Sequence, residues 1–216
     1  MNIILFGPPG AGKGTQADKI IKSFNLHKIS TGELLRKEIQ QKTYLGEKIK
    51  HIIGKGKFVS DNIINDLIVK IINDKKIYNQ LLFDGYPRNL DQAKNLDQLL
   101  NSYKQKISCV LSLKVEKEVI VKRILGRQTC SKCGLIFNEF YYRATEKNHL
   151  CGNKFLIKRS DDNEKTITQR YETYLSKTLP IFDYYNKLNL LHEIDGKIEI
   201  DQIFDKISHI IASLEA

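Results

Sequence analysis

Short apolar segments alternate with longer amphipathic segments along this chain. Residues 2–6 and 80–84 are apolar runs of the kind expected for strands buried on both faces of a sheet, and 107–115 and 190–194 also read as strands. Strands separated by helices predict an α/β fold with a central parallel sheet flanked by two helical layers. The periodicity predicts helices over 16–24, 31–41, 46–53, 60–73, 89–103, 119–125, 164–188 and 201–214.

The alternation of strands and helices is interrupted between residues 126 and 162. Apolar and aromatic residues there, from Leu135 to Tyr142, follow the shorter period of a strand. Three of the four cysteines lie in the same stretch. This stretch therefore predicts a small β insertion within a single domain.

The composition is that of a folded protein with a basic surface. Of the 216 residues, 41% are hydrophobic and 28% are charged, which supports a substantial core. No apolar run approaches the roughly 20 residues that cross a bilayer, and the first residues lack the basic region of a secretory signal. Four cysteines are few for a disulfide scaffold, so we expect a soluble cytoplasmic protein. The net charge of +10 predicts a polyanionic partner, whether nucleic acid, an acidic membrane or a phosphorylated small molecule.

A glycine-rich segment, GPPGAGKGT at residues 7–15, follows the first predicted strand. Glycines permit a tight turn whose N–H groups, with the start of the next helix, bind phosphate. Lys13 adds a positive charge for the β and γ phosphate oxygens. The general phosphate-loop pattern has Ser or Thr directly after the lysine, whereas here Gly14 intervenes before Thr15. The alternative is a strand-to-helix turn without a ligand, which the coincidence of strand, spacing, lysine and helix disfavours.

Four further blocks follow the glycine-rich segment: STGELLR at 30–36, FDGYPRN at 83–89, KRILGRQ at 122–128 and RSDDNEKTITQR at 159–170. In this order they resemble the nucleoside monophosphate kinases, and specifically the adenylate kinases with a long lid. The resemblance implies the reversible reaction ATP + AMP = 2 ADP, with Mg²⁺ brought by the nucleotide, and a role in adenine nucleotide balance. It also implies one kinase domain, comprising a three-layer P-loop core (1–29, 60–125 and 163–216), a helical AMP-binding insertion (30–59) and a β lid (126–162).

The positively charged residues are very unequal in kind, since 28 are lysines and seven are arginines. Phosphoryl transfer needs two polyanions held in line with their charge neutralised. Arginine binds phosphate through two N–H groups at once, whereas lysine acts as a point charge. Six of the seven arginines lie in the five blocks. The alternative for any one of them is a solvated surface side chain, which their grouping in the blocks disfavours.

The resemblance assigns roles to these arginines and their neighbours. By it, Arg36 and Arg88 hold the phosphate of the monophosphate, and Arg127 lies over the base of the triphosphate. The implied catalytic residues are Lys13, Asp84, Arg88, Arg123, Arg159 and Arg170. The implied ATP-binding residues are Gly10, Ala11, Gly12, Lys13, Gly14, Thr15, Arg123, Arg127, Ile136, Phe137 and Lys197. The implied AMP-binding residues are Thr31, Arg36, Lys57, Phe58, Val59, Gly85, Arg88, Gln92, Arg159 and Arg170.

Three polar residues carry more specific expectations. Asp84 ends an apolar strand, where P-loop enzymes place a carboxylate for Mg²⁺; the alternative is a cap of the following turn. In the resembled kinases a threonine at the position of Thr31 faces adenine, and the Gln92 amide can pair with an adenine edge. Both residues favour AMP as the acceptor. The alternatives are an N-cap for Thr31 and a solvated helix face for Gln92.

Cys130 and Cys133 have the spacing of a zinc knuckle, and Cys151 adds a third thiol. In zinc-bearing adenylate kinases the fourth ligand lies three residues beyond the third cysteine, and that position is Lys154 here. The local substitute is His149. We therefore expect a structural Zn²⁺ in the lid, with an unmetallated lid held by aromatic packing as the alternative. In either case the lid is expected to close over the triphosphate and exclude water.

Other functions stay open at this point. The donor could be GTP, or the acceptor UMP or CMP, although the long lid and Thr31 argue against a pyrimidine acceptor. In a different class of protein, a basic surface with a zinc knuckle could bind nucleic acid through Tyr141 and Tyr142 beside Arg143. We expect instead a monomer whose partners are ATP, AMP and ADP, without nucleic acid or membrane.

Overall fold

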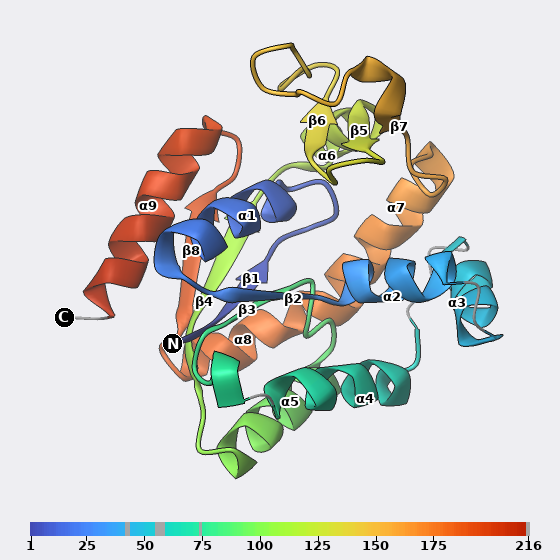
Figure 1. Ribbon diagram of the computed structural model, residues 1–216. Helices are drawn as coiled ribbons and strands as arrows, with labels where there is room; N and C mark the ends of the chain where they lie inside the picture. Colours follow the sequence, from blue (N-terminus) through green and yellow to red (C-terminus); the bar gives the residue numbers. More distant parts are fainter. Residues whose placement is uncertain (42–43, 55–58, 74, 215–216) are drawn as a thin grey trace.

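A five-stranded parallel sheet forms the centre of the molecule (Figure 1). The computed structural model describes residues 1–41, 44–54, 59–73 and 75–214. The strands follow the order β2-β3-β1-β4-β8, and every neighbouring pair is parallel, which confirms the predicted α/β class. These strands are β1 (Asn2–Phe6), β2 (His27–Ser30), β3 (Leu81–Asp84), β4 (Ile107–Lys114) and β8 (Leu191–Asp195).

Helices cover both faces of this sheet and complete three layers (Figure 1). The α-helices of the described part of the chain are α1 (Lys13–Phe24), α2 (Thr31–Gln40), α3 (Tyr44–Gly54), α4 (Asp61–Ile72), α5 (Leu90–Ser102), α6 (Lys117–Leu125), α7 (Glu164–Thr173), α8 (Pro180–Lys187) and α9 (Ile200–Ser213), with a short 3₁₀ turn, η1 (Lys75–Ile77). In β1, Ile3 and Leu5 pack with α1 and α9, whereas Ile4 and Phe6 pack with α5 and α8 on the opposite face. Since side chains alternate along a strand, an unbroken apolar run indicates burial on both faces, as predicted.

The carboxyl ends of β1, β2 and β3 meet at one edge of the sheet. Across the parallel pairs, Leu5 lies opposite Asp84, and Ser30 lies opposite Asp84 from the other side. The loop after β1 and the beginning of α2 therefore lie beside the Asp84 carboxylate. Open parallel sheets bind their ligands at this edge.

A separate antiparallel sheet lies at the top of Figure 1. It has the order β6-β5-β7 and consists of β5 (Arg127–Cys130), β6 (Ile136–Asn138) and β7 (Leu156–Ile157), with the 3₁₀ turn η2 (Asn153–Phe155) before β7. Phe137 is buried in it, stacked on Tyr142 at 5.7 Å and beside His149 at 4.8 Å between ring centroids. The predicted β insertion is confirmed.

The helix predicted over 164–188 is divided by a π-helical turn. This turn, η3 (Tyr174–Thr178), lies between α7 and α8. The Thr178 hydroxyl donates a hydrogen bond to the carbonyl oxygen of Arg88 at 2.9 Å, so the turn is tied to the loop after β3. π-helical turns are frequent at functional sites, and this one lies in the wall of the cavity described below. No helix in the described ranges is both long and apolar enough to span a membrane.

β2 is absent from the predicted elements. It has four residues, its first residue His27 is exposed, and Ile29 is its one strongly apolar side chain. A short strand at the edge of a sheet needs no continuous apolar run, because part of it faces solvent. Its pattern is therefore too weak to identify a strand from sequence.

Candidate active site

The loop between β1 and α1 has the geometry of a phosphate loop. Gly7, Gly10 and Gly12 adopt φ angles of 149°, 81° and 98°, which favour glycine. At Gly10 a Cβ atom would also lie 2.7 Å from Cγ1 of Ile124. The first N–H groups of α1, which begins at Lys13, have no partner within the helix, and no side chain caps them. Such a helix start binds anions.

Lys13 lies across this loop. Its Nζ donates hydrogen bonds to the carbonyl oxygens of Gly7 at 2.6 Å and Pro8 at 3.0 Å. Burial lowers the pKa of Lys13 from 10.5 to about 8, against the opposing effect of the Asp84 carboxylate. A phosphate anion at this loop would favour the charged form of the lysine.

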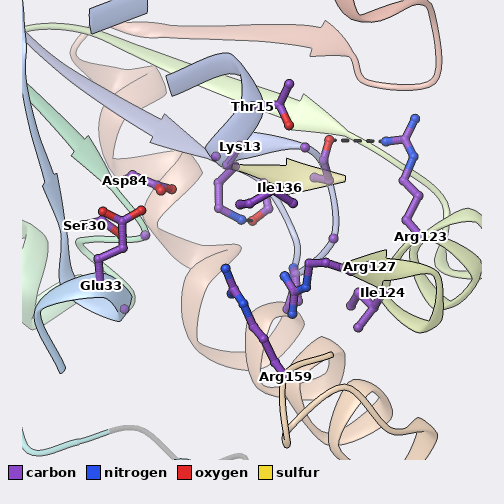
Figure 2. A pocket seen from close by; sticks show the side chains of 18 of the residues that line it. Lys13, Thr15, Ser30, Glu33, Asp84, Arg123, Ile124, Arg127, Ile136 and Arg159 are labelled. Atoms are coloured by element: carbon purple, nitrogen blue, oxygen red, sulfur yellow. Dashed lines mark hydrogen bonds between the residues drawn. The ribbon is translucent and has the colours of Figure 1, made fainter. Parts of the chain in front are cut away.

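A cavity of about 640 Å³ lies above the phosphate loop, between the edge of the central sheet and the small sheet. Figure 2 shows Arg127 and Arg159 reaching into it toward Lys13. The arginines that line it are Arg36, Arg88, Arg123, Arg127, Arg159 and Arg170, which are the six of the sequence blocks. The seventh, Arg143, is exposed on the small sheet and donates from Nε to the Glu139 carbonyl oxygen. The six come from separate elements, so only the fold brings them together.

Positive charge is concentrated in this cavity. Burial lowers the pKa of Arg88 to about 10, and the neighbouring Arg170 and Arg36 lower it too. Burial likewise lowers the pKa of Arg159 to about 10, together with the charge of Arg127. Both guanidinium groups stay charged at neutral pH, so a polyanion entering the cavity meets desolvated positive charge.

Two aspartates hold two of the arginines in place. The Asp162 carboxylate, whose side chain is 1% exposed, accepts two hydrogen bonds from Arg127, that from Nε at 2.9 Å. Asp161 pairs with Arg170. Burial acts to raise the pKa of Asp161, but the charge of Arg170 and its hydrogen bond bring it below the ordinary value. These aspartates belong to the RSDDNEKTITQR block, but no role was predicted for them from the sequence.

Asp84 shares the cavity with Lys13 and Thr15 (Figure 2). Burial raises the pKa of the Asp84 carboxyl group, an effect that the charge of Lys13 opposes. Carboxylate and hydroxyl oxygens beside a phosphate loop are the kind of ligand that Mg²⁺ prefers, directly or through water. The side chains present therefore fit a magnesium ion that arrives with a nucleotide.

Thr31 and Gln92 lie behind the cavity wall, 3% and 2% exposed, near the loop that begins at Gly85. The Thr31 hydroxyl and Nε of Arg88 both donate to the Gly85 carbonyl oxygen, at 3.0 Å and 2.7 Å. Ser30 occupies the N-cap position of α2, so the alternative of Thr31 as an N-cap is wrong. The alternative of a solvated Gln92 is also wrong, because its side chain is buried.

The segment before α4 is described only in part. Val59 is buried and lines the cavity, and its contact with AMP stays a prediction. Lys57 and Phe58 lie outside the described residues. Glu33 also lines the cavity, although no role was predicted for it; its place in the STGELLR block was the available signal.

At the opposite end, the small sheet lies directly over the phosphate loop. Ile136 and Phe137 both line the cavity, and Cδ1 of Ile136 is 3.5 Å from where a Cβ on Gly14 would lie. Arg123 donates from Nη1 to the Ala11 carbonyl oxygen at 3.3 Å, and its guanidinium lies 5.5 Å from the centre of the Tyr141 ring. This contact was not predicted from the sequence.

Lys197 is placed differently from the other predicted ATP-binding residues. Its ammonium group pairs with the Glu116 carboxylate at 2.9 Å, and its side chain does not line the cavity. Its neighbours Ile198 and Ile200 do. The contact of Lys197 with ATP stays a prediction.

Sequence similarity to known proteins points to one family. A sequence profile of the family described as "Adenylate kinase" matches residues 5–190. The adenylate kinase of Pelagibacter ubique is 49% identical over 98% of this chain and 99% of its own length. The chain belongs to the adenylate kinase family. The adenylate kinases of Methanothrix thermoacetophila and Archaeoglobus fulgidus are 41% and 36% identical over the full length of both chains. The protein is therefore a nucleoside monophosphate kinase, a phosphotransferase.

In this adenylate kinase the cysteines of the small sheet gather around a histidine. The ligand atoms of Cys130, Cys133, His149 and Cys151 all lie within 4.8 Å of one another. His149 is 4% exposed, and neither ring nitrogen has a hydrogen-bond partner among the described residues. A tetrahedral zinc ion, with Zn–S distances of about 2.3 Å, spaces its sulfur ligands about 3.7 Å apart, so the cluster fits such an ion. Lys154 lies apart from the cluster, over the Phe155 ring.

Family membership also bears on the other functions left open by the sequence. Tyr141 and Tyr142, the residues considered for nucleic-acid binding, line the same cavity as the phosphate loop. The adenylate kinase relatives favour neither a nucleic-acid-binding function nor a GTP-, UMP- or CMP-specific kinase.

Proposed function

We propose that this protein catalyses the reversible reaction ATP + AMP = 2 ADP in the cavity above the phosphate loop. One observation carries the proposal: Lys13 and six of the seven arginines line a single cavity at the carboxyl edge of a parallel sheet. Such a constellation can hold two polyphosphates in line and neutralise the charge that spreads over the transferring group.

In the proposed arrangement, the phosphate loop holds the β and γ phosphates of ATP. The N–H groups of residues 10–15 and the Lys13 ammonium supply the contacts, and Arg123 neutralises charge from the side of α6. Arg127, Ile136 and Phe137 cover the donor nucleotide from above. The contact between Ile136 and the loop at Gly14 supports a position of the small sheet directly over the donor.

AMP is proposed to bind between α2 and the loop after β3. Arg36 and Arg88 hold its phosphate, and Arg159 and Arg170 lie between the two nucleotides, where they neutralise charge during transfer. Thr31, Val59, Gly85 and Gln92 form the proposed acceptor-base end, with the predicted Lys57 and Phe58. Gln92 is buried in this structure, so in the proposed arrangement AMP binding must first expose its amide group.

Mg²⁺ would be held by the nucleotide, with Asp84 ordering its water ligands, and it would neutralise phosphate charge. We further propose that residues 126–162 close over ATP and exclude water, and that 30–59 closes over AMP, around a core of 1–29, 60–125 and 163–216. Zn²⁺ on the cysteine and histidine cluster would hold the lid together without a catalytic role.

We propose a monomeric enzyme of the cytoplasm that maintains the balance of adenine nucleotides, with no nucleic-acid or membrane partner. The distribution of the arginines supports small phosphorylated partners, because six of the seven line the cavity and only Arg143 lies outside it, on the small sheet.

A coupled assay of diphosphate formation tests the function. ATP and GTP are compared as donors, and AMP, UMP and CMP as acceptors, each in the presence and absence of Mg²⁺. The expected result is the highest kcat/KM for ATP with AMP and dependence on Mg²⁺. Faster transfer to UMP or CMP would contradict the proposal.

ATP binding is expected to take up a proton at Lys13 above pH 8. In the free protein the pKa of Lys13 is about 8, so the side chain is mostly neutral at pH 9. Bound phosphates favour the charged form and raise this pKa, so nearly one proton is absorbed at pH 9 and little at pH 7, and affinity weakens as the pH rises. Titration calorimetry in two buffers of different ionisation enthalpy measures the uptake. With Lys13→Arg, whose guanidinium stays charged, the uptake should disappear; equal uptake in both proteins would exclude Lys13 as its source.

A further inference from the structure

Asp61 links the beginning of α4 to the proposed acceptor-base end of the site. It is the first residue of α4, and Ser60 alone separates it from the 30–59 segment. Its carboxylate accepts a hydrogen bond from Nδ2 of Asn89 at 3.1 Å and another from Nε2 of Gln92. Asn89 caps α5 by accepting from the Gln92 main-chain N–H at 2.8 Å. The carboxylate thus holds two amide side chains at the start of one helix.

These contacts give the Gln92 amide one orientation. Its Oε1 accepts from the main-chain N–H of Arg88 at 2.7 Å, while its Nε2 donates to Asp61. A main-chain N–H can only donate and a carboxylate can only accept. A reversed amide would place its oxygen against the carboxylate and its NH₂ against the Arg88 N–H. Both contacts would be repulsive in a side chain that is 2% exposed.

The orientation decides what the amide can still recognise. A primary amide has two N–H donors and two carbonyl lone pairs. Among the residues whose side chains the structure describes, the partners of the Gln92 amide occupy one of each, so one N–H and one lone pair remain. Adenine offers an amino donor beside a ring-nitrogen acceptor, which this pair matches. A 6-oxopurine offers a carbonyl acceptor beside a ring N–H and would require the amide to turn over.

We propose that Asp61 is a positioning residue that fixes the polarity of the Gln92 amide and thereby makes the acceptor site select 6-aminopurine over 6-oxopurine monophosphates. The inference rests on the proposed contact between Gln92 and the acceptor base. An unrestrained glutamine can rotate its amide to suit either base, so selectivity comes from the contacts that prevent rotation. Asp61 accepts a hydrogen bond from Nε2 of the amide, and the main-chain N–H of Arg88 donates one to its Oε1, so the two contacts together prevent rotation.

The test compares AMP with inosine 5′-monophosphate, which differs at the 6-position and N1 but retains the purine shape. In Asp61→Ala, the ratio of kcat/KM for AMP to that for the inosine nucleotide is expected to fall about tenfold or more, mainly through KM. KM for ATP should remain within about twofold of its original value. If the alanine variant does not fold, Asp61→Asn replaces it, because it has the same shape but one acceptor oxygen fewer for the two amides.

Asn65→Ala is the matched control. Asn65 lies one turn further along α4, and its side chain accepts a hydrogen bond from the Tyr86 hydroxyl at 3.0 Å. The hydrogen bonds found among the described residues do not join Asn65 to the Gln92 side-chain amide. Its loss should lower the melting temperature but leave the base ratio unchanged. An equal loss of selectivity in Asn65→Ala would show a general effect of α4 on the site and overturn the proposal.

Gln92→Ala tests whether Gln92 contacts the acceptor base at all, separately from the role of Asp61. If Gln92→Ala lowers the base ratio while the Asp61 variant keeps it within about twofold, Gln92 reads the base without Asp61 and the inference is wrong. If Gln92→Ala leaves the ratio unchanged, Gln92 does not read the acceptor base, and the proposed role of Asp61 is then wrong as well. Transfer from ATP to AMP by the unaltered protein is measured alongside, so failure of the proposed function would be seen directly.

Discussion

Arg88→Lys is expected to lower kcat by about 10²–10³-fold and to raise KM for AMP. Arg88 lines the cavity and lies where burial and neighbouring arginines lower its pKa to about 10. Its Nε is held by the Gly85 carbonyl oxygen, which fixes the plane of the guanidinium. Lysine retains the positive charge but lacks the planar pair of N–H groups that binds two oxygens of one phosphate. The loss of activity therefore measures what this geometry contributes at constant charge. Steady-state kinetics with ATP and AMP measure both constants.

The matched control is Arg143→Lys, because Arg143 is the one arginine outside the cavity. It is exposed on the small sheet, where its Nε donates to the Glu139 carbonyl oxygen. Its replacement should leave kcat and both KM values within about twofold. A decrease of less than about fivefold for Arg88→Lys would mean that charge alone is sufficient at this position.

The second large effect is expected in the cysteine and histidine cluster. The purified protein should contain one equivalent of zinc, and His149→Ala should lose most of it and lower the melting temperature by roughly 5–10 °C. His149 is buried with both ring nitrogens unpaired among the described residues, so it needs a partner that the protein does not supply. Metal analysis and thermal unfolding with and without a chelator measure the two effects.

His209→Ala provides the comparison, since His209 is an exposed histidine on α9. It should change neither zinc content nor melting temperature. A protein that is free of metal as purified, binds no zinc when it is added and melts at the same temperature with chelator would support the unmetallated lid. In that case the stacking of Phe137 on Tyr142 and its tilted contact with the His149 ring would help to hold the lid together.

Much of the fold follows from local pattern. The central strands β1 and β3 contain unbroken apolar runs, 3–6 and 81–83, because both faces of a parallel sheet are covered, and such runs are visible without a structure. β2 has no such run, since it is short and lies at the sheet edge. The division of the predicted helix 164–188 by η3 likewise depends on contacts with other parts of the chain, such as that of Thr178 with Arg88.

Residue type and position were sufficient to identify the charged lining of the site. A chain that uses lysine four times as often as arginine places six of its seven arginines in five short blocks, and all six line the cavity. The cluster partner His149 could also be named, because it lies two residues from Cys151. The structure groups one of its ring nitrogens with the thiols of the three cysteines, whereas its role as a zinc ligand stays a prediction.

The sequence by itself thus determined the fold class, the phosphate loop, the family and the set of arginines that line the cavity, because each depends on spacing within a short segment. Only the tertiary structure decided which side chains act on one another across segments. The pairing of Asp162 with Arg127, the packing of Tyr141 on Arg123 and the hold of Asp61 on Gln92 join residues that are 18 to 35 positions apart. Hydrogen bonds and ring contacts act over a few ångströms, so no local pattern records them until the chain has folded.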